Sequence, residues 1–429
     1  MKDEKVYLRY TEGCCWRRVI DLKLLEEYFR ANGCRIVDTP EKADYYILET
    51  CAFVKRTEDI AIREIEEAKK YDAKLIVTGC LPGINEERMR EVFEGSAVNT
   101  ADLEDINILF PDFEKPLQLS QDCNELFQQE QVRGKRITFM ALLRFLLRNL
   151  SLRPNYYGRL YSTARRIMRS GIGLKRHIYY IRISWGCASP HCTFCVEWRA
   201  VGSCNISKPM ADCLKEVRNG LEAGYRDFAI IADNPAAWGS EWEDENAPRF
   251  PDLIRAILEV DPSVNISNID GIHPFWMKQY RPQLMELVAT GRIKSIMSAL
   301  QSGNNRILEL MNRRYTSEEY LDLMQGLRKA NPDIILITQI IAGFPSETFE
   351  EFQESVDLVI EAEFSNVTVF PYYCNPLTPA AELDKKVDDG EKFRRVEYAL
   401  KRLGQAGILS LNLGVEVDPR YQKDKALYD

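Results

Sequence analysis

The stretch WGCASPHCTFC, residues 185–195, places three cysteines in one short loop. They are Cys187, Cys192 and Cys195. The residues before the loop, 179–184, predict a buried β-strand. Three thiolates with no obvious fourth ligand suit a 4Fe–4S cluster that binds them through three irons and keeps one iron open. A zinc knuckle completed by Cys204 or His191 is the alternative.

Downstream of this loop, strand and helix patterns alternate in six βα units. The predicted strands are 179–184, 227–232, 264–269, 294–299, 334–341 and 366–372, and the predicted helices are 210–223, 251–260, 276–290, 317–329 and 349–362. Units of this length predict an open (β/α)6 partial TIM barrel of α/β class over residues 177–385. Active sites of such barrels lie where strands pass into loops at the carboxyl face, which is where the cysteine loop falls.

Upstream, residues 1–105 alternate in the same way and predict a Rossmann-like domain with a parallel sheet. The predicted strands are 5–10, 44–48 and 74–77, and the predicted helices are 19–31, 59–71 and 86–93. The overall fold class is therefore α/β, with a parallel-sheet domain before the partial barrel.

A cysteine follows each of these three strands: Cys14, Cys51 and Cys80. Because the carboxyl ends of parallel strands lie along one edge of a sheet, these residues are expected to gather there. Three converging thiolates predict a second 4Fe–4S cluster. A zinc ion that takes Cys15 as its fourth ligand, or three inert cysteines, are the alternatives.

Composition sets the broad class of protein. The chain has 429 residues, of which 45% are hydrophobic and 28% charged, and its formal net charge is −8. These values are typical of a globular protein and exclude collagen-like and wholly disordered chains. The sequence has neither a leader pattern nor a run of about 18 apolar residues, so we expect a cytoplasmic protein without a membrane span. We also expect a monomer. The reducing cytoplasm disfavours disulfides among the twelve cysteines, and four of them are expected to be small hydrophobic residues: Cys34, Cys123, Cys213 and Cys374.

Residues 106–176 interrupt the alternation and are expected to be a basic insertion or linker. From Gln131 to Val196 there are thirteen Lys and Arg residues and no Asp or Glu. Such a stretch suits RNA, an acidic peptide, a membrane surface or the acidic remainder of the chain itself. If the stretch contacts the acidic remainder of the chain, its role is structural.

Several motifs, taken in order, resemble the radical S-adenosylmethionine (radical SAM) methylthiotransferase family. They are YTEGC (10–14), LETC (48–51), VTGC (77–80), the GC…CTFC loop, ALQSGNNRILELMNRRYTSEEY (299–320), IIAGFPSETFEEF (340–352) and NPLTPAAEL (375–383). The resemblance implies two 4Fe–4S clusters and S-adenosylmethionine as cofactors. It also implies that an electron from the loop cluster cleaves S-adenosylmethionine to a 5′-deoxyadenosyl radical. The amino-terminal cluster would then deliver a methylated sulfur to an unactivated carbon.

The resemblance also implies contacts to S-adenosylmethionine, but it assigns no catalytic residue. An aromatic backbone position and an apolar segment flank the adenine, and polar groups meet the methionine amine and carboxylate. The matching positions are Phe194, Asp233, Asn234, Gln301, Ser302, Arg313, Arg314, Ile341 and Gly343.

The chain departs from the family pattern in several places. The loop reads C-x4-C-x2-C where the family has C-x3-C-x2-C. Arg17 replaces a usual Asn. Cys15 follows Cys14 directly, which leaves open which of the two is the ligand, although the TxGC context favours Cys14. Gln339 and Ser346 replace a usual Asp and Gly. Residues 386–429 predict a helix at 393–409 and a tail too short for the substrate-binding TRAM domain.

The partners follow from this interpretation. The substrate is expected to be a peptide, a small metabolite or RNA, and the electron donor a protein such as flavodoxin or ferredoxin. A radical SAM enzyme that uses the amino-terminal cluster as an electron relay or substrate anchor is the second hypothesis. A zinc-containing nucleic-acid-binding protein is the third.

Overall fold

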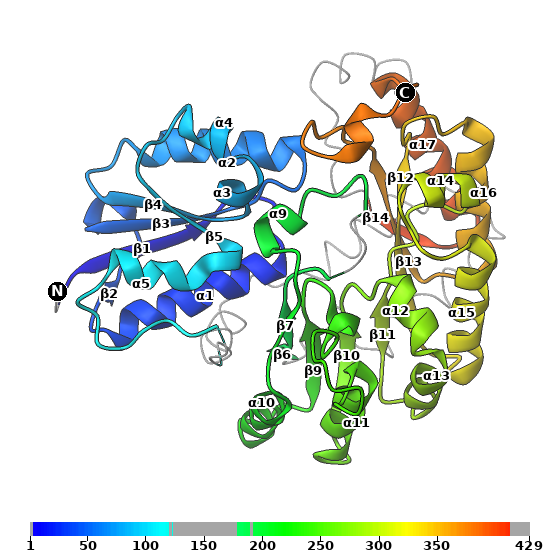
Figure 1. The fold of residues 1–429 in the computed structure, drawn as a ribbon, viewed down its shortest axis with the longest axis horizontal. Coiled ribbons are helices and arrows are strands. Elements are labelled where there is room, and N and C mark those ends of the chain that lie inside the picture. The colour runs from blue at the N-terminus through cyan, green and yellow to red at the C-terminus, as the bar shows by residue number, and fades with distance from the viewer. Residues whose placement is uncertain (1–2, 120–121, 123–177, 189–191, 412–429) are drawn as a thin grey trace.

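The computed structural model describes residues 3–119, 122, 178–188 and 192–411, which form two α/β domains side by side (Figure 1). Most of the basic segment, with Cys123 and the 412–429 tail, lies outside the described residues. Among the helices of the described part of the chain, none combines the length and the apolar character that crossing a membrane requires.

The amino-terminal domain is a five-stranded parallel sheet in the order β2-β1-β3-β4-β5. Its strands are β1 (Lys5–Tyr10), β2 (Arg35–Ile36), β3 (Tyr45–Thr50), β4 (Lys74–Gly79) and β5 (Ser96–Asn99). Its helices are α1 (Trp16–Ala31), α2 (Lys55–Ala68), α3 (Cys80–Ile84), α4 (Glu86–Arg90) and α5 (Ile106–Leu109), and η2 (Thr100–Asp105) is a 3-10 helix. The predicted parallel-sheet domain is confirmed, and β2, β5 and α3 are elements that the sequence patterns did not predict.

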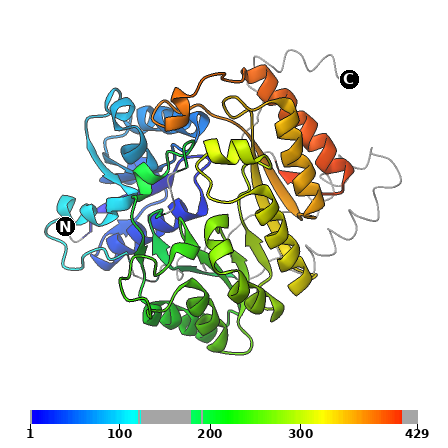
Figure 2. The same ribbon diagram turned by 45° about the vertical axis from the view of Figure 1, so that its right-hand side comes forward.

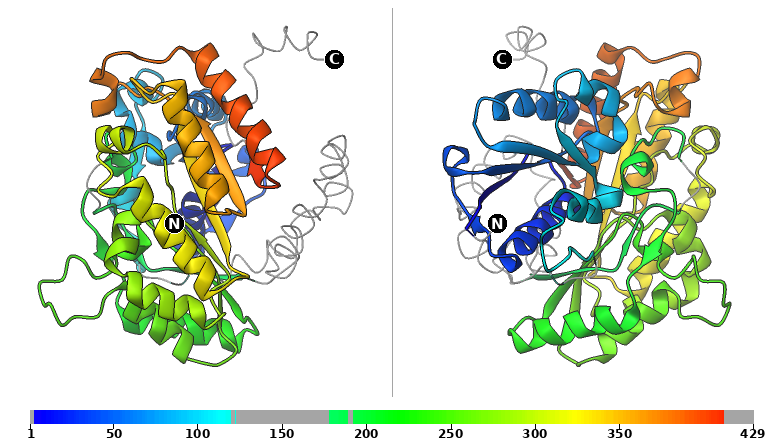
Figure 3. Two further views of the ribbon diagram at one scale, coloured as in Figure 1. Left: turned by 90° about the vertical axis from the view of Figure 1, so that its right-hand side faces the viewer. Right: turned by 60° about the vertical axis from the view of Figure 1, so that its left-hand side comes forward.

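Two hydrophobic cores hold this sheet between its helices (Figure 3, right). Side chains alternate across β3, so that Ile47 packs with α1 and α5, whereas Leu48 packs with α2, α3 and α4. Phe110 and Leu117 belong to the first core. The segment expected to be a linker from residue 106 therefore begins as part of this domain.

The second domain is built on a seven-stranded parallel sheet in the order β14-β13-β12-β11-β10-β9-β6. Its strands are β6 (Ile178–Arg182), β9 (Asp227–Ile231), β10 (Asn265–Ile269), β11 (Ser295–Met297), β12 (Ile335–Ala342), β13 (Asn366–Pro371) and β14 (Leu409–Leu411). A separate two-stranded hairpin joins β7 (Ser184–Trp185) to β8 (Ile206–Ser207). The six predicted barrel strands are present.

The helices of this domain lie along the outer face of its sheet (Figure 2). They are α10 (Met210–Glu222), α11 (Phe250–Glu259), α12 (Pro274–Gln279), α13 (Arg281–Ala289), α14 (Asn305–Leu310), α15 (Ser317–Ala330), α16 (Phe349–Glu361) and α17 (Asp389–Gln405). The short helix α9 (Trp198–Val201) instead packs against the amino-terminal domain. The 3-10 helices η4 (Pro235–Ala237) and η5 (Pro379–Glu382) complete the set of elements used below. One large core joins these helices to the sheet.

Two helix predictions in this domain were wrong in detail. The single helix expected at 276–290 is divided into α12 and α13, and Pro282 lies in the first turn of α13, where its missing N–H costs no hydrogen bond. The helix expected at 393–409 instead spans Asp389–Gln405, because Gly407 takes a left-handed φ of 73°. The chain then forms β14, which pairs with β13, so residues 386–411 extend the barrel sheet and do not form a separate unit.

Candidate metal centres

The amino-terminal cysteines lie at the carboxyl ends of three adjacent strands. Cys14 follows β1, Cys51 follows β3, and Cys80 opens α3 directly after β4. In the sheet Tyr10 is paired with Glu49, and Thr50 with Gly79, so the three strand ends are in register. The predicted gathering of these residues at one edge of the sheet is therefore confirmed, whereas the metal that they bind stays a prediction.

Gly79 shows how tightly this edge is built. Its φ is +100°, and a Cβ atom added there would lie 2.3 Å from the carbonyl oxygen of Thr50. A glycine is therefore required for the chain to turn from β4 into α3 beside the end of β3. This turn brings Cys80 next to Cys51.

Burial dominates the electrostatics of these thiols. Desolvation raises the pKa of Cys14, of Cys51 and of Cys80. The buried guanidinium of Arg18 opposes this effect and lowers the pKa of Cys80. Thiolates at this edge would therefore be stabilised by added positive charge, which is what iron supplies.

Cys15, the N-cap residue of α1, also belongs to this neighbourhood. A thiolate at Cys15 would raise the pKa of Cys51 and Cys80, and also that of Cys14. The Sγ atom of Cys14 instead lies 3.7 Å from the carbonyl oxygen of Glu49 and 3.5 Å from the hydroxyl of Thr11. Both cysteines are thus placed where a third thiolate ligand is needed.

The second trio lies in the loop that follows β7. Gly186 opens this loop with a φ of +84°, and a Cβ there would lie 1.9 Å from the carbonyl oxygen of Cys204. The backbone N–H of Cys187 donates to Gly202 over 3.1 Å, and that of Cys195 donates to Cys192 over 3.1 Å. The loop thus has its own internal hydrogen bonds, and residues 189–191, with His191 of the zinc alternative, lie outside the described residues.

Cys192 has two nitrogen groups near its sulfur. Arg313 Nη1 donates to the Sγ atom over 3.2 Å, and Nε2 of His273 lies 3.9 Å from it. Burial, with the nearby Arg313 charge, lowers the pKa of His273, so its ring is neutral. For Cys195, burial raises the pKa of the thiol, and the backbone N–H of Glu197 donates to its Sγ over 3.4 Å.

Buried charges connect the two cysteine sites across the domain junction. The side chain of Arg17, two residues after Cys15, lies 3.6 Å from the carboxylate of Glu197, two residues after Cys195. Arg17 also donates to the carbonyl oxygen of Ala232 over 3.0 Å and lies 3.7 Å from Asp233.

Arg18 continues this network inside the junction. It pairs with Asp21 over 2.8 Å and with Asp233 over 3.5 Å. Arg182 of β6 also contacts both carboxylates. Cations from both domains therefore neutralise Asp233, whose second oxygen accepts from the backbone N–H of Gly186 over 3.0 Å.

The structure brings some of the predicted S-adenosylmethionine contacts together. Phe194 packs in the same hydrophobic cluster as Ile341, Phe344 and Tyr372. Gln301, which has a φ of 69°, accepts from the backbone N–H of Ile341 over 2.9 Å, and its side-chain oxygen has no hydrogen-bond partner. A mainly apolar corner thus forms beside the cysteine loop.

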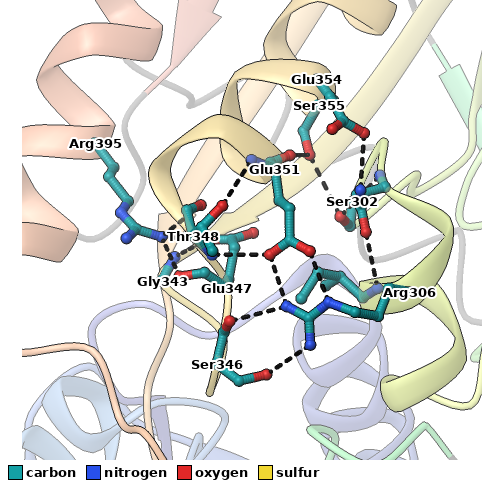
Figure 4. A network of polar contacts seen from close by, with 12 residues as sticks. Ser302, Arg306, Gly343, Ser346, Glu347, Thr348, Glu351, Glu354, Ser355 and Arg395 are labelled. Carbon is teal, nitrogen blue, oxygen red and sulfur yellow. Dashed lines mark hydrogen bonds and ion pairs between the residues drawn. The ribbon is translucent and has the colours of Figure 1, made fainter.

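Other predicted contacts are engaged elsewhere (Figure 4). The hydroxyl of Ser302 lies 3.4 Å from that of Ser355 on α16, and the backbone N–H of Gly343 donates to Glu347 over 2.6 Å. Burial raises the pKa of Glu347 to about 7, although Arg395 pairs with it over 3.0 Å. The remaining predicted contacts are Asn234, which is buried at the start of η4, and Arg314, which is exposed.

The donor chemistry of both trios fits iron–sulfur clusters. Each trio supplies three thiol groups from buried or half-buried residues. Within the described ranges, no group of three or more His, Cys, Asp or Glu side chains is spaced for a single metal ion. In a cluster each thiolate binds a different iron, so the sulfur atoms lie farther apart than around one zinc ion. Three thiols without a fourth protein ligand are the donor set that a 4Fe–4S cluster with one open iron takes.

A surface groove of about 410 Å³ lies between η2 and the β7–β8 hairpin. Its walls include Asp102, Glu104 and Asp105 on one side and Trp185 and Ile206 on the other. None of the predicted site residues lines it.

The sequence patterns missed four residues that contact these sites. They are Arg18, Arg182, Glu197 and His273. Only His273 had a signal in the sequence, since it lies just past the carboxyl end of a predicted barrel strand and is one of three histidines.

Two family models match the chain, one to each domain. Residues 181–359 match the radical SAM superfamily, and residues 5–99 match the uncharacterized protein family UPF0004. The matched ranges contain both cysteine trios.

Similar proteins extend over most of the chain. A protein of Thermotoga petrophila named tRNA-2-methylthio-N(6)-dimethylallyladenosine synthase is 28% identical over 90% of this chain and 79% of its own length. One of Azorhizobium caulinodans named ribosomal protein uS12 methylthiotransferase RimO is 27% identical over 95% of this chain and 82% of its own.

Solved structures support the fold. The radical S-adenosylmethionine methyltransferase TsrM from Kitasatospora setae covers 88% of this chain and 77% of its own, with a TM-score of 0.58 and 14% identity. The radical enzyme OxsB covers 92% of this chain and 56% of its own, with a TM-score of 0.52 and 15% identity. At this identity the similarity concerns the fold alone.

Proposed function

We propose that this chain, a member of the radical SAM methylthiotransferase family, transfers a methylthio group to an unactivated carbon with the help of two 4Fe–4S clusters. Cys187, Cys192 and Cys195 would hold one cluster, and Cys51 and Cys80 with a cysteine of the 14–15 pair would hold the other. When bound, the first cluster supplies the electron that cleaves S-adenosylmethionine, and the second supplies the sulfur.

The close approach of the two cysteine sites carries this proposal. Arg17 and Glu197 follow one cysteine of each site by two residues and lie 3.6 Å apart. The charge of Glu197 also raises the pKa of Cys51 and of Cys80 across the junction. A group released at one site therefore has a short path to the other.

Residues of the chain itself orient and shield this path. Arg17, Arg18 and Arg182 fix Asp233 at the carboxyl end of β9, so the two domains are held in one arrangement. Phe194 and Ile341 offer an apolar surface for an adenine ring, and the free carbonyl oxygen of the Gln301 side chain offers a hydrogen-bond acceptor. Such a shielded site protects a radical from water and from side reactions.

We propose RNA as the acceptor, and specifically an adenosine of a transfer RNA. Several curated relatives are named for that product, and the Thermotoga petrophila protein among them matches 90% of this chain. The ribosomal-protein enzyme of Azorhizobium caulinodans makes a protein the second candidate. A small electron-transfer protein of the flavodoxin or ferredoxin kind would reduce the clusters in the cytoplasm.

Transfer of label tests this function. The anaerobically reconstituted full chain is incubated with a reductant, methyl-labelled S-adenosylmethionine and either transfer RNA that already carries N(6)-dimethylallyladenosine but no methylthio group, or ribosomal protein. Label in the RNA as a methylthio group is the expected result. Label in the protein alone would select the second candidate, whereas 5′-deoxyadenosine without label in either would favour a different C–H reaction.

Iron content then separates Cys14 from Cys15. The sequence motif favours Cys14, whose sulfur lies 3.7 Å from the carbonyl oxygen of Glu49 near the end of β3, so we expect Cys14→Ala to lose about half of the bound iron and Cys15→Ala to keep it. The two variants are matched controls for each other. The opposite result would assign Cys15 as the ligand.

A further inference from the structure

The sulfur atoms of Cys192 and Cys195, in the same loop, are contacted by different kinds of group. The Cys195 sulfur accepts from a neutral backbone N–H, that of Glu197, over 3.4 Å. The Cys192 sulfur is approached by two side chains, the guanidinium of Arg313 at 3.2 Å and the imidazole of His273 at 3.9 Å. Both side chains come from barrel loops far from Cys192 in the sequence.

Arg313 is fixed in place by backbone carbonyl and hydroxyl groups. Its Nη2 donates to the carbonyl oxygen of Ala299 over 2.6 Å, and its Nε donates to the hydroxyl of Tyr315 over 3.1 Å. That hydroxyl in turn donates to the carbonyl oxygen of Leu300 over 2.6 Å. Arg313 is only 7% exposed, and these bonds hold its third nitrogen, Nη1, against the Cys192 sulfur.

The tautomer of His273 follows from its position as the N-cap of α12. Its Nδ1 accepts a hydrogen bond from the backbone N–H of Phe275 over 3.2 Å. A neutral imidazole that accepts at Nδ1 carries its proton on Nε2. The Nε2–H group is therefore the part of His273 that faces Cys192.

We propose that Arg313 and His273 are positioning residues that donate hydrogen bonds to the Cys192 thiolate and thereby raise the reduction potential of the cluster bound there. The inference rests on the proposed function, since it requires a cluster on this loop. Reduction adds negative charge to the cluster, and donors to its sulfur ligands stabilise that charge. Arg313 thus acts on the cluster, in place of the contact to the methionine carboxylate that the family resemblance implies.

A potentiometric titration of the full chain with both clusters tests this inference. The loop cluster is identified by the change of its EPR signal when S-adenosylmethionine is added, and its potential is then measured without S-adenosylmethionine. At a fixed ambient potential, Arg313→Gln is expected to lower the ratio of reduced to oxidised cluster about tenfold, equivalent to 59 mV for one electron. His273→Asn keeps an acceptor for the Phe275 N–H and is expected to lower the ratio about threefold, because the longer bond comes from a neutral donor.

Controls separate this effect from general damage. Arg306→Gln removes an exposed guanidinium that pairs with Glu351 and is expected to leave the potential unchanged. Arg313→Lys keeps the positive charge and is expected to fall between the wild type and Arg313→Gln. If Arg313→Gln does not retain iron, the inference is tested with Arg313→Lys and His273→Asn.

Two results would overturn the inference. One is an unchanged potential in Arg313→Lys, Arg313→Gln and His273→Asn. The other is weaker binding of S-adenosylmethionine by Arg313→Gln at an unchanged potential, which would assign Arg313 to the methionine carboxylate. If the wild type showed no cluster signal that responds to S-adenosylmethionine, the proposed function itself would fail.

Discussion

The two cysteine sites of this protein are built in different ways. The amino-terminal site takes one residue from the end of each of three neighbouring strands, and Cys51 and Cys80 are only 5% exposed. The barrel site takes all three residues from one loop, and all three are partly exposed. The first site therefore exists only when the sheet has formed, whereas the second depends on a local turn and its hydrogen bonds.

This difference predicts how each site responds to damage. A change near the strand-end site acts on the β-sheet and its two cores, because its cysteines directly follow the paired strands. A change near the loop site acts mainly on the short β7–β8 hairpin and on the residues beside it. The two sites meet at the charged junction of Arg17 and Arg18 with Glu197 and Asp233.

The largest expected effect separates the chemistry of the two sites. Cys192→Ala is expected to abolish both cleavage of S-adenosylmethionine and methylthio transfer, because removing a ligand exceeds the roughly 100-fold loss from an outer partner. Cys51→Ala is expected to abolish transfer but to keep cleavage within about threefold of wild type. Both are measured by chromatography of 5′-deoxyadenosine and of labelled product. Loss of cleavage in Cys51→Ala would show that the two sites do not act separately.

The next effect concerns the glycines before Cys80 and Cys187. Gly79→Ala places a Cβ against sheet backbone and is expected to cost about 4 kcal/mol of unfolding free energy. Gly186→Ala is expected to cost less, because the Cys204 backbone in the facing loop is able to shift. Gly224→Ala, with a φ of +89° and no atom within 4 Å, serves as the control at about 1 kcal/mol. Denaturant unfolding measures the free energy of unfolding of all three variants. Equal losses in Gly79→Ala and Gly186→Ala would contradict the expected difference between the two sites.

The smallest effect tests the junction between the sites. Arg18 is 1% exposed, and Arg18→Met leaves Asp21 and Asp233 with fewer cations, which is expected to cost about 3 kcal/mol. Arg30→Met removes a half-exposed cation from Glu26 on the same helix and is expected to cost below about 0.5 kcal/mol. Thermal or denaturant unfolding measures the difference. A loss below about 1 kcal/mol in Arg18→Met would show that Arg182 and Arg17 suffice to hold the two carboxylates.

The sequence predicted the elements whose signals are local. The strand at residues 5–10 was placed at its observed bounds, and the six barrel strands were found because apolar runs alternate with amphipathic helices. The edge position of the amino-terminal cysteines followed from the rule for parallel strands. These inferences needed only patterns within short windows.

What the sequence did not show depends on distant partners. The strand β14 has three residues, and its pairing with β13 defines it more than its composition does. The contacts of Arg18 with Asp233 and of Arg313 with Cys192 join residues separated by more than a hundred positions. An arginine in a helix is usually a solvated charge, so nothing local distinguishes one that is buried at a domain junction.

Because these cysteines lie at the ends of strands, the chain between them is free to vary in length and sequence. Between Cys51 and Cys80 the polypeptide forms α2 and a return to β4, and only the ladder between β3 and β4 determines where the two sulfur atoms lie. Insertions or deletions in that crossover would alter the sequence distance between these cysteines without moving either one. Related sites of this kind are thus better recognised by the strand that precedes each cysteine than by a fixed interval between them.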